Sequence, residues 1–142
     1  MHLYNNTFTI ISQLTVFIIS MMDIVFINER KNRMYQLEYH QLDQNITQLL
    51  NHFELYKFAI VTDDKNKHKY QTQIHQFVAT DLNYLEKSNL CKHSLIHYQY
   101  FQFLTEQHSH PIVEFTVGNT AGHITTLQNR LHEIRKLLSV FL

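Results

Sequence analysis

The most apolar part of the chain lies near its N-terminus. Residues 8–27 read FTIISQLTVFIISMMDIVFI and carry one charge, on Asp23. A run of this length and composition is typical of a helix that spans a membrane. The pattern therefore predicts a hydrophobic N-terminal helix over residues 1–27 that anchors the protein, followed by one domain over residues 28–142. The expected location is a membrane that the chain crosses once.

The same apolar run has a second interpretation. Gln13 and Asp23 are more easily accommodated by a soluble helix, buried in a core or paired with its own copy, than by lipid. In that case the protein is cytoplasmic. A basic cluster, Arg30 to Arg33, follows the run, and no Lys or Arg precedes it. If the run spans a membrane, this asymmetry places the rest of the chain on the cytoplasmic side.

A second hydrophobic pattern follows, and it has the spacing of a helix. Apolar residues recur every three or four positions from residue 35 to residue 56. We expect a long amphipathic helix whose apolar face packs against the protein's own core, or alternatively receives a partner. The candidate interaction residues on this stripe are Tyr35, Tyr39, Leu42, Ile46, Leu49 and Phe53.

The middle of the chain shows shorter patterns that resemble strands. Residues 58–62 and 68–74 flank a polar stretch, an order that predicts a β-hairpin. Residues 95–104 alternate between apolar and polar, and residues 111–117 form a second such run after the loop TEQHSH.

Helical spacing returns in residues 75–90 and again from residue 123 to the C-terminus. The predicted order is helix, strand, strand, helix, strand, strand, helix. The fold class expected from this order is α+β, with a long hydrophobic N-terminal helix, short antiparallel strands and an amphipathic C-terminal helix.

Composition narrows the range of functions. The 142 residues contain 12 basic and 12 acidic side chains, so no net charge attracts the chain to nucleic acid as a whole. Only two glycines are present, and no glycine-rich phosphate loop or catalytic serine motif occurs. We therefore expect a protein that is not an enzyme, with no cofactor and no small-molecule substrate.

Eleven histidines raise the question of a metal site. The candidate ligands are His93, His97, His108 and His110, because imidazole binds zinc and other transition metals. Histidine is so frequent here that chance alone produces spacings of this kind. A scatter due to composition is the alternative to a metal site.

The first helical region resembles a known family. Phe8-Thr9-Ile10-Ile11-Ser12 and the apolar residues after it are similar to the N-terminus of type IV pilins and competence pseudopilins, in which Phe-Thr-Leu-Ile-Glu opens a long helix. The resemblance covers residues 8–56. It implies a membrane-anchored, non-enzymatic assembly subunit of a secretion or DNA-uptake apparatus. Its partners would be other anchored subunits or its own copy, and membrane lipid through residues 8–27.

Residues 68–141 have a second resemblance, to winged-helix regulators of the MarR type. The segment VATDLNYLEKSNL is similar to a recognition helix and its following turn, and residues 95–104 and 111–117 would form the wing. This alternative implies a DNA-binding regulator that dimerises through its N-terminal helix. The DNA-binding residues would be Lys69, Gln76, Thr80, Asn83, Lys87 and Lys92. A membrane-associated interaction protein of no known class is the third interpretation.

Overall fold

The computed structural model describes residues 10–11, 13–15, 18, 35–114 and 116–142. The chain divides into two units, Met1–Gln36 and Leu37–Leu142. In the first unit residues 10–11, 13–15 and 18 are helical, and the Thr15 hydroxyl donates a hydrogen bond of 2.9 Å to the Ile11 carbonyl. The helices described below lie in the second unit, apart from Gln36, the first residue of α2.

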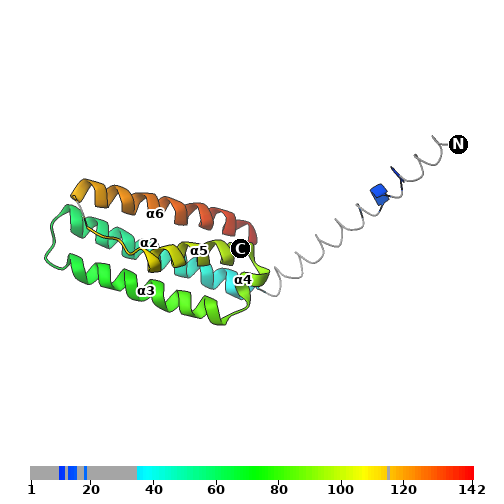
Figure 1. Cartoon of the computed structure of the whole chain (residues 1–142), viewed down its shortest axis with the longest axis horizontal. Helices are drawn as coiled ribbons and strands as arrows, with labels where there is room; N and C mark the ends of the chain where they lie inside the picture. The colour runs from blue at the N-terminus through cyan, green and yellow to red at the C-terminus, as the bar shows by residue number, and fades with distance from the viewer. Residues whose placement is uncertain (1–9, 12, 16–17, 19–34, 115) are drawn as a thin grey trace. The chain divides into compact units, whose positions relative to one another are not determined.

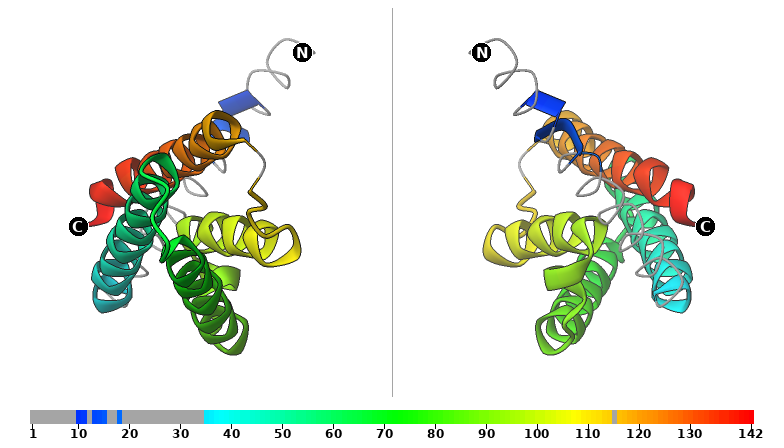
Figure 2. Two further views of the ribbon diagram at one scale, coloured as in Figure 1. Left: turned by 90° about the vertical axis from the view of Figure 1, so that its left-hand side faces the viewer. Right: turned by 90° about the vertical axis from the view of Figure 1, so that its right-hand side faces the viewer.

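The second unit is built from helices that pack side by side. Its four long helices alternate in direction along the chain, so that each runs antiparallel to the long helix before it (Figures 1 and 2). The elements are α2 (Gln36–Val61), α3 (Lys67–Lys87), α4 (Leu90–His93), α5 (Leu95–Ser109), α6 (Val117–Leu138) and the 3₁₀ helix η1 (Ser139–Phe141). No strand occurs in the part of the chain that the structure describes. The expected α+β class is therefore wrong, and the unit is an all-helical bundle.

Helix α2 contributes the largest share of the core. Its apolar stripe repeats at intervals of three and four residues, which keeps one face turned toward the other helices. Ile46, Leu49, Phe53 and Tyr56 are each 0% exposed. The Phe53 ring meets the Phe103 ring of α5 edge to face, with ring centroids 6.4 Å apart. The buried stripe thus joins α2 to α5 along the centre of the bundle.

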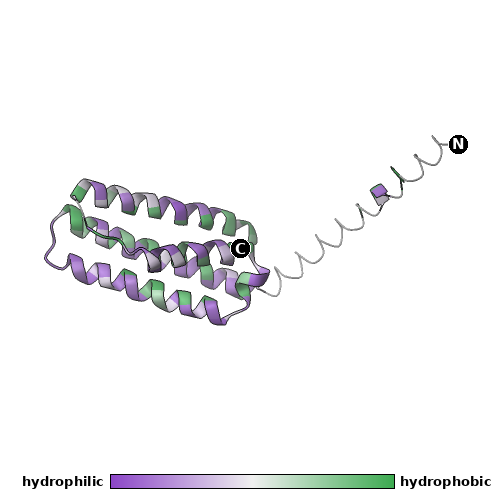
Figure 3. Ribbon diagram, in the orientation of Figure 1, coloured by the Kyte–Doolittle hydropathy of each residue, from purple (hydrophilic) through white to green (hydrophobic). Residues whose placement is uncertain are grey.

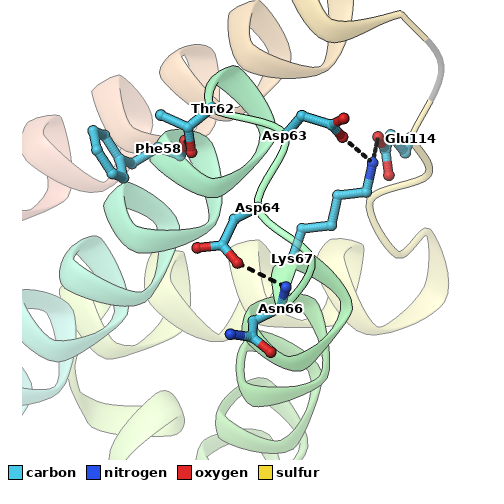
Figure 4. Close-up of polar contacts among 7 residues, drawn as sticks. All are labelled: Phe58, Thr62, Asp63, Asp64, Asn66, Lys67 and Glu114. Carbon is cyan, nitrogen blue, oxygen red and sulfur yellow. Dashed lines mark hydrogen bonds and ion pairs between the residues drawn. The ribbon is translucent and has the colours of Figure 1, made fainter.

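The predicted β-hairpin is wrong because both of its strands are parts of helices. Residues 58–61 are the last turn of α2, and residues 68–74 lie in α3. The polar stretch between them does form a turn. Asp63 adopts a φ of 51°, in the left-handed region, and Asp64 Oδ1 accepts a hydrogen bond of 2.8 Å from the Asn66 backbone N–H (Figure 4). These contacts reverse the chain and end α2.

The second predicted strand pair is also wrong. Residues 95–104 belong to α5, and no described residue between 111 and 116 lies in a strand. Ser94 caps the start of α5, because its hydroxyl accepts a hydrogen bond of 3.3 Å from the His97 backbone N–H. Thr116 caps α6 in the same way through the Asn119 N–H, at 3.2 Å. The caps favour helix where the local alternation resembles a strand.

The expected transmembrane helix and single-pass membrane location are contradicted. Among the described residues, no helix combines the length and the apolar character needed to cross a bilayer. The longest helix, α2, carries charged side chains along its length, including Glu38, Asp43 and Lys57. Of the predicted span itself, residues 8–27, only 10–11, 13–15 and 18 lie within the described residues.

Candidate functional site

A chain of hydrogen-bonded polar side chains, buried at Asp81 and Tyr100, links three of the helices. Asp81 of α3 is 8% exposed and accepts hydrogen bonds from Tyr100 of α5, at 2.5 Å, and from the Asn45 amide of α2, at 2.9 Å. The Asn45 carbonyl oxygen in turn accepts a bond of 2.9 Å from the Gln41 amide. These hydrogen bonds form only when the three helices lie in one register relative to one another. We call these four residues the Asp81 network.

The buried environment of the network raises the pKa values of two of its residues, Asp81 and Tyr100. Burial raises the pKa of Asp81, and hydrogen bonds from Tyr100 and Asn45 oppose this increase. Burial also raises the pKa of Tyr100 well above its usual value, with the nearby Asp81 carboxylate as the second cause. The Tyr100 hydroxyl therefore keeps its proton at every physiological pH and acts as a permanent donor to Asp81.

His97 lies beside the network as an isolated buried imidazole. Its side chain is 2% exposed, its Nδ1 is 2.7 Å from the Ser94 hydroxyl, and its ring centroid is 5.6 Å from that of Tyr39. Burial lowers the pKa of His97 to about 4, and a hydrogen bond with the Glu38 backbone and the Glu38 charge oppose this decrease. The ring is therefore neutral at physiological pH and serves to pack α5 against α2.

The cavity between these groups is too small for a substrate. It has a volume of about 10 Å³ and is bordered by Glu38, Asn45, Asp81, His97 and Tyr100, among others. That is room for about one water molecule. The Glu38 Oε2 atom is buried and has no hydrogen-bond partner among the described residues, so a single water is the species that fits. The hydrogen bonds of the Asp81 network join α2, α3 and α5 around this small space.

An apolar surface lies where α2 ends and α6 begins. Both segments are hydrophobic and meet at the same end of the bundle (Figure 3). Phe58 is 66% exposed, and its ring points away from the ion pairs of Lys67 (Figure 4). We define the α2/α6 patch by its exposed members, Leu55, Phe58, Val61, Val117, Gly118 and Gly122.

Polar contacts fix the two helices beneath this patch. Lys57 Nζ lies 3.4 Å from the Thr125 hydroxyl and 3.0 Å from Gln128 Oε1, and the Gln128 amide donates a bond of 2.8 Å to Glu54. Because α2 and α6 are antiparallel, the turn after Lys57 lies beside the turn before Thr125. The last turn of α2 and the first turns of α6 therefore share one continuous surface.

Both glycines of the chain belong to this surface. A Cβ atom built on Gly118 or Gly122 would have no other described atom within 4 Å, and neither residue has a positive φ. The folded unit thus has no steric need for glycine at either position. Glycine in the interior of a helix costs about 0.5–1 kcal/mol relative to alanine.

The structure places the predicted interaction residues mainly in the core. Tyr39, Leu42, Ile46, Leu49 and Phe53 are at most 3% exposed, and Tyr35 precedes α2. Side chains buried in this way are not accessible to a partner while the bundle is folded.

The residues predicted to bind DNA lie on one helix face. Five of the six are on α3 and are exposed, at successive intervals of seven, four, three and four residues: Lys69, Gln76, Thr80, Asn83 and Lys87. This spacing keeps them on a single side of the helix. Lys92 lies in α4 and is also exposed.

The predicted metal ligands lie in two places. His93 ends α4 and His97 lies in the first turn of α5, whereas His108 lies in its last turn and His110 follows it. His97 and His108 are eleven residues apart on one helix, which corresponds to about 16 Å along its axis. Within the described ranges, no group of three or more His, Cys, Asp or Glu side chains is arranged to hold a metal ion.

Sequence reasoning missed the Asp81 network altogether. Asn45 and Asp81 are 36 residues apart, and Asp81 and Tyr100 are 19 apart, so no local motif connects them. One signal was available. Asp81 directly precedes Leu82 on the apolar face of α3, between Val78 and Leu85, and a carboxylate in that position requires partners.

No protein-family model, no curated protein and no solved structure matches this chain. The function is therefore argued from the geometry of the bundle alone.

Proposed function

We propose that this protein is a non-enzymatic assembly subunit, and that two copies pair through the α2/α6 patch. The observation that supports this proposal is the position of the two glycines. Both lie on an exposed helix face beside Phe58, where the isolated unit does not use the missing side chains. A close approach by a second helix would use them, because glycine lets two helix backbones come near each other.

The patch has the properties that a pairing of identical copies requires. A twofold interface brings the same surface of each subunit together, so the surface must contain both a projection and a matching depression. Phe58 and Leu55 supply the projection, and the bare backbone at Gly118 and Gly122 supplies the depression. In the proposed pair, the Phe58 ring of each copy packs over Gly122 of the other. Exposed aromatic side chains are favoured as anchors in such interfaces.

The test is the mass of the full chain in solution, measured by analytical ultracentrifugation over a range of concentrations. The unmodified protein should associate reversibly into dimers. Gly122→Leu should remain monomeric, because the new side chain fills the depression. The same change replaces a poor helix former with a good one at an open position, so the monomer should keep or increase its stability.

A matched control separates this effect from a general effect of adding leucine. His123→Leu introduces the same residue at the next, exposed position of α6, on a different side of the helix. This variant should dimerise like the unmodified chain. The proposal would be contradicted if Gly122→Leu formed dimers with the same affinity as the unmodified chain. It would also be contradicted if the unmodified chain stayed monomeric at every concentration.

A second candidate function is binding to nucleic acid along the outer face of α3, favoured by the alignment of Lys69, Gln76, Thr80, Asn83 and Lys87. Side chains of this kind contact phosphates and base edges. Binding of a DNA duplex should weaken as salt increases, and Lys69→Ala together with Lys87→Ala should reduce both the affinity and the salt dependence. If the double variant bound DNA as tightly as the parent, the outer face of α3 would not be the DNA-binding surface.

A further inference from the structure

An open cleft lies between α3 and α5, away from the α2/α6 patch. Its volume is about 380 Å³, within the range of about 300–1,000 Å³ that is typical of small-molecule sites. Thr72, His75 and Gln76 line it from α3, and Gln107 and His108 line it from the last turns of α5. Its remaining walls are apolar and include Pro111.

Two of the side chains that line this cleft have a polar group without a hydrogen-bond partner among the described residues. Gln107 is 8% exposed, and no hydrogen bond joins its side-chain amide to any other described residue. The Nε2 atom of His75 is buried and likewise has no hydrogen-bond partner within the described residues. Buried polar groups in folded proteins almost always have partners, because an unpaired one costs free energy. Of the two groups, the Gln107 amide is the one that a ligand in the cleft can contact, because His75 Nε2 is buried away from solvent.

We propose that this cleft binds an uncharged aromatic heterocycle that carries hydrogen-bond donors and acceptors on one edge, the chemistry of a nucleobase. A side-chain amide offers one acceptor and two donors side by side, which is how glutamine pairs with the edge of adenine. Gln107 supplies that amide. None of the lining residues is Lys, Arg, Asp or Glu, so an ion pair has no part in the binding.

The inference goes beyond the proposed assembly function, because the cleft and the α2/α6 patch share no residue. The probe for the first test is free adenine, titrated into the isotope-labelled full chain and followed by NMR. The side-chain amide signals of Gln107 and the ring signals of His75 should shift. For a ligand of this size we expect a dissociation constant of about 1 mM.

Variants test the role of the amide. Gln107→Leu keeps the size of the side chain but removes its donors and acceptor, and should weaken adenine binding roughly tenfold. Gln102→Leu is the matched control, because Gln102 is exposed on the same helix and its amide, among the described residues, bonds only to the Tyr98 hydroxyl. It should bind adenine like the parent. Thermal unfolding of both variants shows whether each is folded.

The choice of ligand class is tested with indole, a bicyclic aromatic compound of similar size. Indole has one hydrogen-bond donor, its N–H, and no ring nitrogen that accepts a hydrogen bond. Indole should bind at least tenfold more weakly than adenine. Equal binding of indole and adenine, equal binding by Gln107→Leu and the parent, or the absence of any shift at Gln107 would each overturn the proposal.

A free base and a base carried on a nucleic acid share this chemistry. A single-stranded deoxyadenosine oligonucleotide distinguishes them. If the oligonucleotide binds more tightly than adenine and loses this affinity in Gln107→Leu, the cleft takes a base from a nucleic acid. If it binds no more tightly than adenine, the cleft takes the free heterocycle.

Discussion

Helix α2 is held on its two sides by different kinds of polar contact. Toward α3 and α5 the contacts are buried, with Asp81 at 8% exposure and Tyr100 at 0%. Toward α6, Gln128 is also buried, at 8% exposure, but the ion pair between Asp43 and Arg135 lies near the surface. The Asp43 and Arg135 side chains, whose Oδ1 and Nε atoms are 3.0 Å apart, are 27% and 42% exposed. The distances are similar, so the Asp81–Tyr100 contact and the Asp43–Arg135 ion pair differ mainly in their access to water.

The difference predicts which contacts determine the arrangement of the helices. A surface ion pair is worth about 0–1 kcal/mol, because water competes for both partners. A buried hydrogen-bonded group contributes little net energy when satisfied, but its loss leaves a desolvated partner behind. The buried contacts toward α3 and α5 should therefore be sensitive to small chemical changes, and the Asp43–Arg135 ion pair toward α6 should tolerate them. Four measurements test this contrast.

The largest effect is expected in the apolar stripe that both sides share. Ile46 is 0% exposed, and Ile46→Asp should lower the free energy of unfolding by about 4 kcal/mol, because an unpaired carboxylate would enter the core. Gln44→Asp, at an exposed position of the same helix, should change it by less than about 0.5 kcal/mol. Urea denaturation followed by circular dichroism measures both. Equal midpoints would mean that the stripe is not part of the core.

Acid should act on the buried side through His97. Its folded pKa of about 4 lies below the unfolded value near 6.5, so between these values the unfolded chain binds more protons. Stability should therefore fall as the pH drops from 6.5 to 4, by up to about 3 kcal/mol. The raised pKa of Asp81 acts in the opposite sense, because the native state then holds the extra proton.

Comparison with His97→Phe isolates the histidine, because Asp81 and Glu38 remain in both proteins. Phenylalanine keeps a ring against Tyr39 and does not titrate. Denaturant titrations at several pH values should show a smaller loss in acid for the variant. Parallel stability profiles for the two proteins would show that His97 does not titrate in this way.

Tyr100→Phe tests the network directly. The change removes one oxygen and leaves Asp81 Oδ2 without its donor, so we expect a loss of about 2 kcal/mol. Tyr98→Phe is the control, because Tyr98 is exposed and its hydroxyl accepts a bond from Gln102 alone within the part of the chain that the structure describes. It should cost less than about 0.5 kcal/mol. A Tyr100 variant as stable as the control would remove the basis for distinguishing the two sides.

The smallest effect is expected on the α6 side. Arg135→Ala should change the free energy of unfolding by about 0.5 kcal/mol or less, and the difference should shrink further in high salt. Chemical denaturation at low and high salt concentrations measures it. A loss as large as that of Tyr100→Phe would show that exposure to water does not separate the two sides.

The sequence was informative where one pattern extends over a long segment. The stripe from Tyr39 to Tyr56 spans several turns, and only a helix brings its members together. Around Ile96, Tyr98 and Tyr100 the segment was too short to separate a period of two from one of 3.6. The buried residues of α5 follow the helical period, with Ile96, Tyr100, Phe103 and Gln107 on one face.

The polar sites could not be predicted for a different reason. The Asp81 network and the α3/α5 cleft each join side chains from separate helices, and their geometry exists only after the helices pack. In the sequence, the two glycines served only to exclude a glycine-rich phosphate loop. Their position on an open face of α6, beside Phe58, emerges from the antiparallel pairing with α2.

The turn between α2 and α3 has a consequence for how fast the bundle forms. Asp63 in the left-handed conformation, Asp64 bonded to Asn66, and Lys67 Nζ within 3.2 Å of Asp63 and 3.0 Å of Glu114 hold a reversal between two consecutive helices (Figure 4). Two helices joined by a short turn make contacts between residues that are near in sequence, and such contacts form rapidly. If this hairpin is the folding nucleus, weakening the turn slows folding and leaves the rate of unfolding almost unchanged.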